Sequence, residues 1–267
     1  MGPDKSGKSF WLIELAYRAM TQRHRVLFFE AGDMTQNQIM ERLQVRNCGI
    51  PNRATKPGDK YCEYTYPKRF IDGDSVQVAA VHYKKSLLDI EKALAGRDSL
   101  MKDRMKSTKS YLRLSCHSTD TLKVSEMKDI ARREARKGWS PEIIVADYAD
   151  ILLAPSGIEH SRDQSNAIWK QLRGLSQEMN CLVVTASQSN AKGYKSDLLD
   201  RTNFSEDKRK LAHVTGMIGL NVSSDDKEQG LTRLNWIELR DQAFNDRRVC
   251  YVAGCSAISR PAIISKF

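Results

Sequence analysis

Apolar residues recur along this chain with a helical period and, between the helical stretches, in short uninterrupted runs. Leu12, Leu15, Ala16 and Ala19 lie three or four positions apart, which predicts an amphipathic helix over residues 8–22. The apolar run at 26–29 is bounded by charge, so it predicts a buried parallel strand. Helical spacing returns over 34–45, so a second helix is expected there.

The region that follows breaks this pattern. Residues 47–75 combine Pro, Gly and Lys, a composition that predicts a long irregular segment, and we expect an insertion over 47–82. A charged helical stretch is predicted over 84–107.

The alternation of helix and strand then resumes. Strands are predicted at 111–114, 143–147 and 182–185, with helices over 122–137 and around the apolar face of Ile168, Leu172, Leu175 and Met179. Such alternation predicts a parallel sheet with helices on both faces. Later strands are expected near 214–221, 231–239, 248–253 and 262–265, and their short links suit antiparallel edge pairing. The predicted fold is one α/β domain with a mostly parallel central sheet and antiparallel C-terminal edge strands.

Charge and cysteine content narrow the expected partners and compartment. The chain has 267 residues with 43 Lys+Arg against 33 Asp+Glu, and this excess favours a polyanion such as nucleic acid. The six cysteines form no CxxC pair, which argues against a disulfide scaffold or a zinc ribbon. A metal site from Cys48, Cys62, Cys116 and His117 would need tertiary contacts. This cysteine pattern favours a reducing cytosol, which is the host cytoplasm if a phage encodes the protein. No run of 18 apolar residues occurs, so we expect no membrane partner.

A phosphate-binding motif stands at residues 2–9. The match to G-x-x-x-x-G-K-[ST] is complete, with the residues Gly2, Pro3, Asp4, Lys5, Ser6, Gly7, Lys8 and Ser9. In such a P-loop the glycines let backbone N–H groups surround the β-phosphate, Lys8 neutralises phosphate oxygens and Ser9 ligates Mg²⁺. The motif predicts that ATP and Mg²⁺ are the cofactors. A P-loop normally follows a buried strand, and only Met1 precedes this one, so we expect the chain to be a piece of a longer protein.

Two carboxylate positions follow predicted strands. Asp147 ends the run at 143–147 and is the candidate Walker B ligand for the Mg²⁺ shell, with Asp150 as an assisting carboxylate. The strand at 26–29 leads into Glu30 and Asp33, and either could orient the attacking water.

Polar residues follow the third apolar strand. Ligands bind at the carboxyl edge of an open parallel sheet, so Gln188 is expected to touch the γ-phosphate.

The order of these segments resembles the RecA-type ATPase domain of DnaB-family replicative helicases, in a divergent phage-like form. The resemblance covers nearly the whole chain and rests on residues 2–9, 25–43, 143–150, 185–190 and 236–241. Asp33, Met34 and Arg42 match the second motif of that family, so the resemblance favours Asp33 as the base and leaves Glu30 as the alternative.

The resemblance implies a hexameric ring with ATP between subunits, single-stranded DNA as substrate, and a primase or loader protein as a partner. In the closing K-x-R motif of the family, Glu238 replaces the lysine and Arg240 is kept. Arg240 is therefore the expected arginine finger, and a trans-acting lysine is not expected.

Two loops are expected to face nucleic acid. One contains the cations Lys192, Lys195, Arg201, Lys208, Arg209 and Lys210, and the other, at 154–163, is less basic. Aromatic residues are few in both, so binding would involve phosphates and be insensitive to base sequence.

Two other functions fit the same motifs. A recombinase-like filament protein of RecA or RadA type would share the fold, and a loader or adaptor would bind nucleotide without motor activity.

Overall fold

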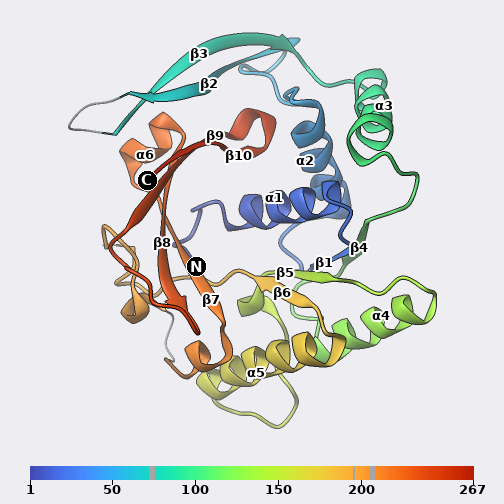
Figure 1. Cartoon of the computed structure of the whole chain (residues 1–267), viewed down its shortest axis with the longest axis vertical. Helices are drawn as coiled ribbons and strands as arrows, with labels where there is room; N and C mark the ends of the chain where they lie inside the picture. The colour runs from blue at the N-terminus through green and yellow to red at the C-terminus, as the bar shows by residue number, and fades with distance from the viewer. Residues whose placement is uncertain (72–75, 195, 205–207) are drawn as a thin grey trace.

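A four-stranded parallel sheet forms the centre of the computed structural model (Figure 1). The structure describes residues 1–71, 76–194, 196–204 and 208–267. The strands of the sheet run in the order β4-β1-β5-β6, and they are β1 (Val26–Glu30), β4 (Leu112–Cys116), β5 (Ile143–Asp147) and β6 (Leu182–Thr185). The predicted parallel sheet is confirmed.

Two helices cover one face of this sheet. Val26 and Phe28 point to that face and pack against α1 (Lys8–Thr21) and α2 (Gln36–Cys48). The helix predicted at 34–45 begins two residues later, because Thr35 and Gln38 form a capping box that starts α2 at Gln36.

Two other helices cover the opposite face. Successive strand residues point to opposite sides of a sheet, so Leu27 and Phe29 face away from α1. They share a core with α4 (Val124–Arg136) and α5 (Ser161–Met179). Helices therefore lie on both faces, as predicted.

The C-terminal strands form a second, antiparallel sheet. Its order is β10-β9-β8-β7, built from β7 (Gly216–Asn221), β8 (Leu231–Leu239), β9 (Val249–Cys255) and β10 (Arg260–Lys266). A short helix, α6 (Ser224–Gln229), separates β7 from β8 and was not predicted. The antiparallel pairing predicted for these strands is confirmed.

The first two residues lie where the two sheets meet. The N–H of Gly2 donates to the Ser187 carbonyl at 3.1 Å, beyond the end of β6. The Met1 carbonyl accepts from the N–H of Leu220 in β7 at 2.8 Å, and the terminal ammonium donates to the Ile218 carbonyl at 2.7 Å. The phosphate-binding motif therefore begins between the sheets.

The region expected to be irregular contains a long hairpin. Strands β2 (Tyr61–Ile71) and β3 (Gln77–Ser86) pair antiparallel and join neither of the other sheets (Figure 1). The prediction for 47–75 was wrong for β2, because Cys62 and Tyr64 are buried against residues distant in sequence, among them Cys255.

The charged helix predicted for 84–107 is shorter than expected. Residues 84–86 belong to β3, α3 spans Ile90–Ser99, and a π-helical turn, η1, follows at Leu100–Met105. The remaining short turns are the 3₁₀ helices η2 (Ala149–Ile151), η3 (Arg201–Asn203), η4 (Lys208–His213) and η5 (Ser256–Ile258). Within the described residues, no helix combines the length and apolar character needed to cross a bilayer.

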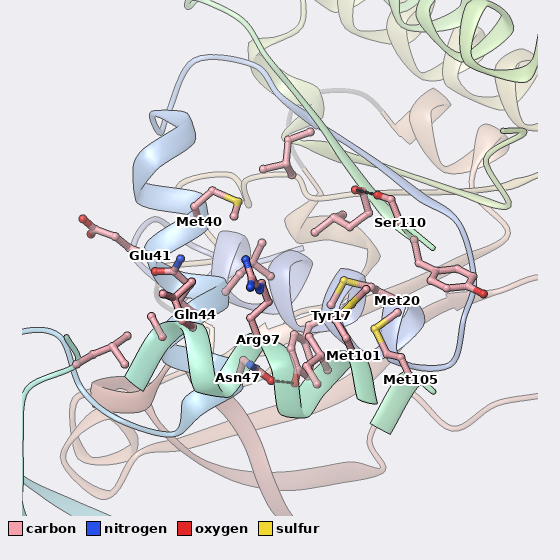
Figure 2. Close-up of a pocket in the computed structure, with 18 of the residues that line it drawn as sticks. Tyr17, Met20, Met40, Glu41, Gln44, Asn47, Arg97, Met101, Met105 and Ser110 are labelled. Atoms are coloured by element: carbon pink, nitrogen blue, oxygen red, sulfur yellow. Dashed lines mark hydrogen bonds between the residues drawn. The ribbon is translucent and has the colours of Figure 1, made fainter. Parts of the chain in front are cut away.

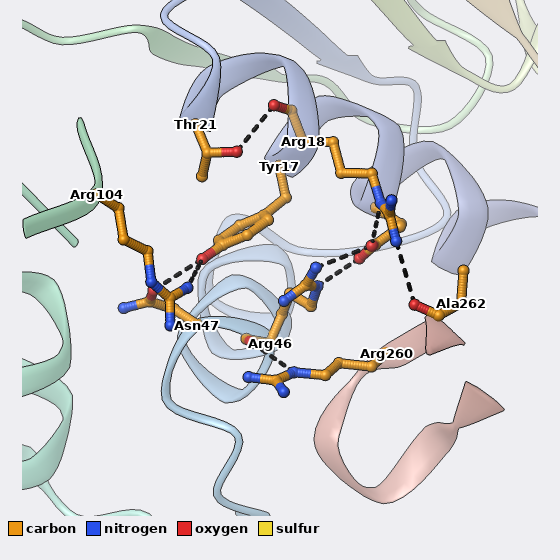
Figure 3. Close-up of polar contacts among 9 residues, drawn as sticks. Tyr17, Arg18, Thr21, Arg46, Asn47, Arg104, Arg260 and Ala262 are labelled. Atoms are coloured by element: carbon orange, nitrogen blue, oxygen red, sulfur yellow. Dashed lines mark hydrogen bonds and ion pairs between the residues drawn. The ribbon is translucent and has the colours of Figure 1, made fainter. Parts of the chain in front are cut away.

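A buried carboxylate on α1 connects that helix to α2 and β10 (Figure 3). Glu14 is 1% exposed and accepts from Arg18 at 2.6 Å and from Arg46 at 2.9 Å. Arg260 donates to the Arg46 carbonyl at 3.2 Å, and Arg18 donates to the Ala262 carbonyl at 3.1 Å. This cluster joins β10 of the antiparallel sheet to α1 and α2.

Candidate nucleotide-binding site

Residues 2–9 form a tight loop that leads into α1. Lys5 and Gly7 adopt left-handed backbone conformations, with φ values of 57° and 85°. No side chain caps the N-terminus of α1, and its first turn contains no acid. A helix N-terminus of this kind attracts a phosphate group through its N–H groups and its dipole.

The Lys8 ammonium lies within the loop. It donates to the Pro3 carbonyl at 2.8 Å and to the Gly2 carbonyl at 3.4 Å. Burial lowers the pKa of Lys8, while the charges of nearby carboxylates, Asp4 first, oppose that shift. The ammonium is thus placed where phosphate oxygens could replace the loop carbonyls.

Asp147 supplies an unsatisfied carboxylate oxygen next to the loop. It is fully buried, and its Oδ1 accepts from the Ser9 hydroxyl at 3.1 Å, whereas Oδ2 has no hydrogen-bond partner. Burial, followed by the charge of Glu30, raises the pKa of Asp147 to about 7. Mg²⁺ prefers carboxylate and hydroxyl oxygens, so Asp147 and Ser9 fit a magnesium ion.

Glu30 and Asp33 have different environments. Oε1 of Glu30 accepts from the N–H groups of Gly32, Asp33 and Met34 at 3.2, 2.7 and 3.0 Å. Burial raises the pKa of Glu30, and these hydrogen bonds oppose the shift. One oxygen of Glu30 therefore holds the turn after β1, while Oε2 is buried without a partner beside Asp147, its register partner in β5.

Asp33 is exposed, and its charge reaches the site. It contributes to raising the pKa of Asp147 and that of Tyr148. Arg42, on α2, stacks on Phe10 at 4.6 Å and is also within reach of the Asp147 charge. Asp33 and Arg42, which match the second family motif, are thus both within electrostatic reach of Asp147.

Gln188 lies next to the P-loop, and Asp150 positions it. The Gln188 amide donates to Asp4 at 3.4 Å. Asp150 accepts from the N–H of Gln188 at 2.7 Å and from the Ser187 hydroxyl at 2.9 Å. Asp150 therefore orders the segment after β6, a role that the sequence did not indicate.

The sequence also gave no indication of a role for Tyr194. Its hydroxyl accepts from the N–H of Asp4 at 3.1 Å, so it joins the basic loop to the P-loop. No motif signals this contact, because the only pattern around Tyr194 in the sequence is the run of basic residues.

The cations of that loop are not equivalent. Lys210 is 2% exposed, lies 3.9 Å from Asp150 and covers the ring of Phe204. In this conformation its ammonium is therefore not available to single-stranded DNA. The expectation for Lys210 is corrected accordingly. A lysine within a charged run is expected to be exposed, and only the tertiary structure shows that this one is buried.

The other loop cations have more accessible positions. Lys192, Arg201 and Arg209 are exposed. Arg209 forms an ion pair with Asp163 at 2.9 Å, which places the two predicted DNA-binding loops side by side. Lys195 and the side chain of Lys208 lie outside the described residues.

Arg240 follows β8 directly and is exposed. Its guanidinium donates to the Ala212 carbonyl at 2.6 Å. Within the described residues no contact joins it to the P-loop of the same chain, so a role at this site would require a second copy.

A large apolar cavity lies elsewhere. It has a volume of about 880 Å³ and opens between α1, α2, α3 and the start of β4 (Figure 2). Four methionines line it, namely Met20, Met40, Met101 and Met105. None of residues 2–9 lines it, so this cavity is separate from the P-loop.

Among the described residues, no group of three His, Cys, Asp or Glu side chains is placed to hold a metal ion.

Comparison with known proteins identifies the architecture. No protein-family model matches the chain, and no curated protein matches it. The chain is similar to a solved structure described as an ATPase domain, with a TM-score of 0.73 and 14% identity over 97% of this chain and 81% of that one. It is also similar to a DnaB-like replicative helicase whose structure was described together with its interactions with primase. That match has a TM-score of 0.67 and 13% identity, and covers 95% of this chain and 55% of the other. The chain therefore has the RecA-like fold of DnaB-type helicase ATPase domains.

Proposed function

We propose that this chain is the ATP-hydrolysing motor domain of a replicative DNA helicase. The observation that carries the proposal is the convergence of Lys8, Ser9 and the buried Asp147 at one end of α1, with Gln188 beside them. The fold of helicase ATPase domains supports the same conclusion. In this proposal the chain is a single domain, and residues 47–82 are an insertion.

Each residue has a defined task. Lys8 and the N–H groups of the loop would bind the phosphates, and Ser9 with Asp147 would hold Mg²⁺, which would supply positive charge to the phosphate oxygens. Asp33 orients the attacking water and accepts its proton, because its carboxylate is exposed and one oxygen of Glu30 is engaged by backbone N–H groups. Gln188 contacts the γ-phosphate. When the γ-phosphate leaves, this contact is lost and the segment that follows β6 can move.

The assembly and substrate are part of the proposal. Arg240 would act on the nucleotide of a neighbouring copy, and the proposed assembly is a closed hexameric ring. Lys192, Arg201 and Arg209 are the exposed cations proposed to contact single-stranded DNA, and the undescribed Lys195 and Lys208 belong to the same loop. A primase or loader protein is the proposed partner.

The test is ATP turnover with and without single-stranded DNA, for the natural chain and for Lys8→Ala. We expect DNA-stimulated hydrolysis that Lys8→Ala abolishes, with an unchanged circular dichroism spectrum. Nucleotide binding without turnover would instead support an adaptor or loader, and open filaments in electron micrographs would support a recombinase.

A further inference from the structure

The β2–β3 hairpin carries a basic surface that the proposed ATPase does not use. Strands β2 and β3 contain four permanent cations, Lys68, Arg69, Lys84 and Lys85, against one carboxylate, Glu63. Figure 1 places the hairpin and α5 at opposite ends of the molecule. Because the loop of Arg209 contacts α5 residues, the hairpin is remote from the loop proposed to bind single-stranded DNA.

The four cations divide between the two faces of the hairpin. Lys84 forms an ion pair with Glu63 at 3.1 Å, so its face is partly neutralised. Residues 79, 81, 83 and 85 alternate onto the opposite face, and Arg69 joins them because it pairs with Ala79. Cys62 and Tyr64 lie on this same face and pack against Cys255 and Ile258, so the base of the face is covered and only its exposed side chains can meet a ligand.

Lys68 belongs to this opposite face as well. It lies at the register shift between Pro67 and Arg69, and its ammonium is 5.0 Å from the Tyr66 ring and 5.5 Å from the Tyr83 ring. Lys85 approaches the same Tyr83 ring at 5.8 Å. We call Lys68, Arg69 and Lys85 the basic hairpin face.

The described acids form no ion pair on this face. Among the described residues, Lys68, Arg69 and Lys85 have no ion pair, and all three are exposed. Rings beneath Lys68 and Lys85 restrain the two ammonium groups through cation–π contacts. Restraint before binding reduces the conformational entropy lost when a ligand is bound.

The surface offers charge and not a base-stacking platform. Tyr83 already contacts Tyr64 at 5.9 Å and Tyr66 at 6.0 Å, in addition to the two lysines. A single strand gains much of its affinity from stacking on free rings, which are absent from the described part of this face. Duplex DNA has the denser charge, with one phosphate about every 1.7 Å of axis. We propose that the basic hairpin face binds the phosphate backbone of duplex DNA.

The experiment compares two triple variants with the same change in charge. One is Lys68→Gln, Arg69→Gln, Lys85→Gln, and the control is Lys102→Gln, Arg133→Gln, Arg136→Gln, three exposed cations away from the hairpin. Fluorescence anisotropy would measure binding to a labelled duplex of about 20 bp, long enough for several phosphate contacts, and to an oligo-dT strand over a range of salt concentrations. Arg69→Gln alone is a second hairpin variant, because no ring contact of Arg69 would be disturbed by its loss.

We expect the hairpin triple to weaken duplex binding at least about tenfold and to lower its salt slope by about 2 to 3, since each phosphate contact contributes roughly 0.9. Arg69→Gln should lower the slope by about 0.9. The control should retain the natural slope, and DNA-stimulated ATP turnover should be unchanged in all variants.

An unchanged duplex slope in the hairpin triple, or equal losses in both triples, would overturn the proposal. A larger loss for oligo-dT than for the duplex would also overturn it and assign the face to single strands. Duplex binding can be measured in a chain without turnover, so failure of the proposed ATPase would be seen separately.

Discussion

At the scale of single residues, the carboxylate that ends β1 and the one in the turn after it have different environments. Glu30 accepts three backbone N–H groups through one oxygen, whereas Asp33 is held near Asp147 by that same turn and remains exposed. A general base must reach a water molecule near the γ-phosphate, and an exposed carboxylate can do so.

The first prediction concerns this division of roles. Asp33→Asn should retain binding of a fluorescent ATP analogue but lower turnover by roughly a hundredfold or more, the usual contribution of a positioned base. Glu30→Gln retains an acceptor oxygen for the turn and should have a smaller effect on turnover. The reverse order of effects, measured under saturating ATP, would assign the base to Glu30.

Also at this scale, Glu14 is expected to contribute strongly to stability. Glu14→Ala leaves the guanidinium of Arg46, which is 12% exposed, without its carboxylate partner. Breaking a buried ion pair on one side destabilises a protein by about 3 to 5 kcal/mol. Urea unfolding would measure this loss.

Glu178 provides the matched control, since it pairs with Lys128 and Arg132 but is 45% exposed. Glu178→Ala should lower the free energy of unfolding much less than Glu14→Ala does, because water and salt screen an exposed ion pair. Similar losses for the two variants would show that the Glu14 cluster does not hold α1, α2 and β10 together.

At the scale of elements, the basic loop is a mixture of exposed and buried cations. Lys210 lies against Asp150 and Phe204, so it supports the segment that carries Gln188. Lys192 is exposed and has no comparable structural contact within the described residues. The loop therefore uses one cation to support the nucleotide site and leaves others exposed for the proposed binding of single-stranded DNA.

The loop prediction follows from that mixture. Lys192→Gln combined with Lys208→Gln should lower the salt slope of oligo-dT binding by about 1.4, or about 0.7 for each lost phosphate contact. Arg133→Gln with Arg136→Gln is the control of equal charge and should leave the slope unchanged. A slope that stays constant in the loop variant would show that these two lysines do not contact the strand.

Tyr194 offers a separate test of the connection between loop and P-loop. Tyr194→Phe removes the hydroxyl that accepts from the N–H of Asp4. We expect basal ATP turnover to be nearly unchanged and the stimulation by oligo-dT to fall severalfold, because the loop loses a direct contact with the nucleotide site. Identical stimulation in the two proteins would remove Tyr194 from the connection.

At the scale of the whole molecule, the role proposed for Arg240 at a nucleotide would need a second copy of the chain. It follows β8, bonds to Ala212 and has no contact with its own P-loop in the described residues. An arginine finger supplied from a neighbour typically contributes about 10³ to 10⁵ in rate. Arg240→Ala should therefore bind ATP and assemble, yet hydrolyse it poorly.

Mixing two inactive proteins tests the shared site directly. A Lys8→Ala subunit still offers Arg240, and an Arg240→Ala subunit still offers Lys8, so mixed rings contain some interfaces with both groups. Turnover should partly return on mixing. Full activity of Arg240→Ala alone, or no recovery in rings shown to exchange subunits, would exclude the shared-site mechanism for this residue.

The parallel sheet, the antiparallel strands and the P-loop motif could be predicted from sequence alone. Their signals are local, because helical spacing, apolar runs and glycine positions depend on neighbouring residues in the chain. The same reasoning placed Gln188 beside the P-loop, since parallel strands present their carboxyl ends at a common edge.

Only the tertiary structure decided which charged groups are buried and which are available. Lys210 and Glu14 are charged residues of a kind usually found at the surface, yet both are buried by elements distant along the chain. The β2–β3 hairpin escaped prediction because its inner side chains pack against β9 and the turn that follows it. Burial and partner choice depend on such long-range contacts, which no local pattern encodes.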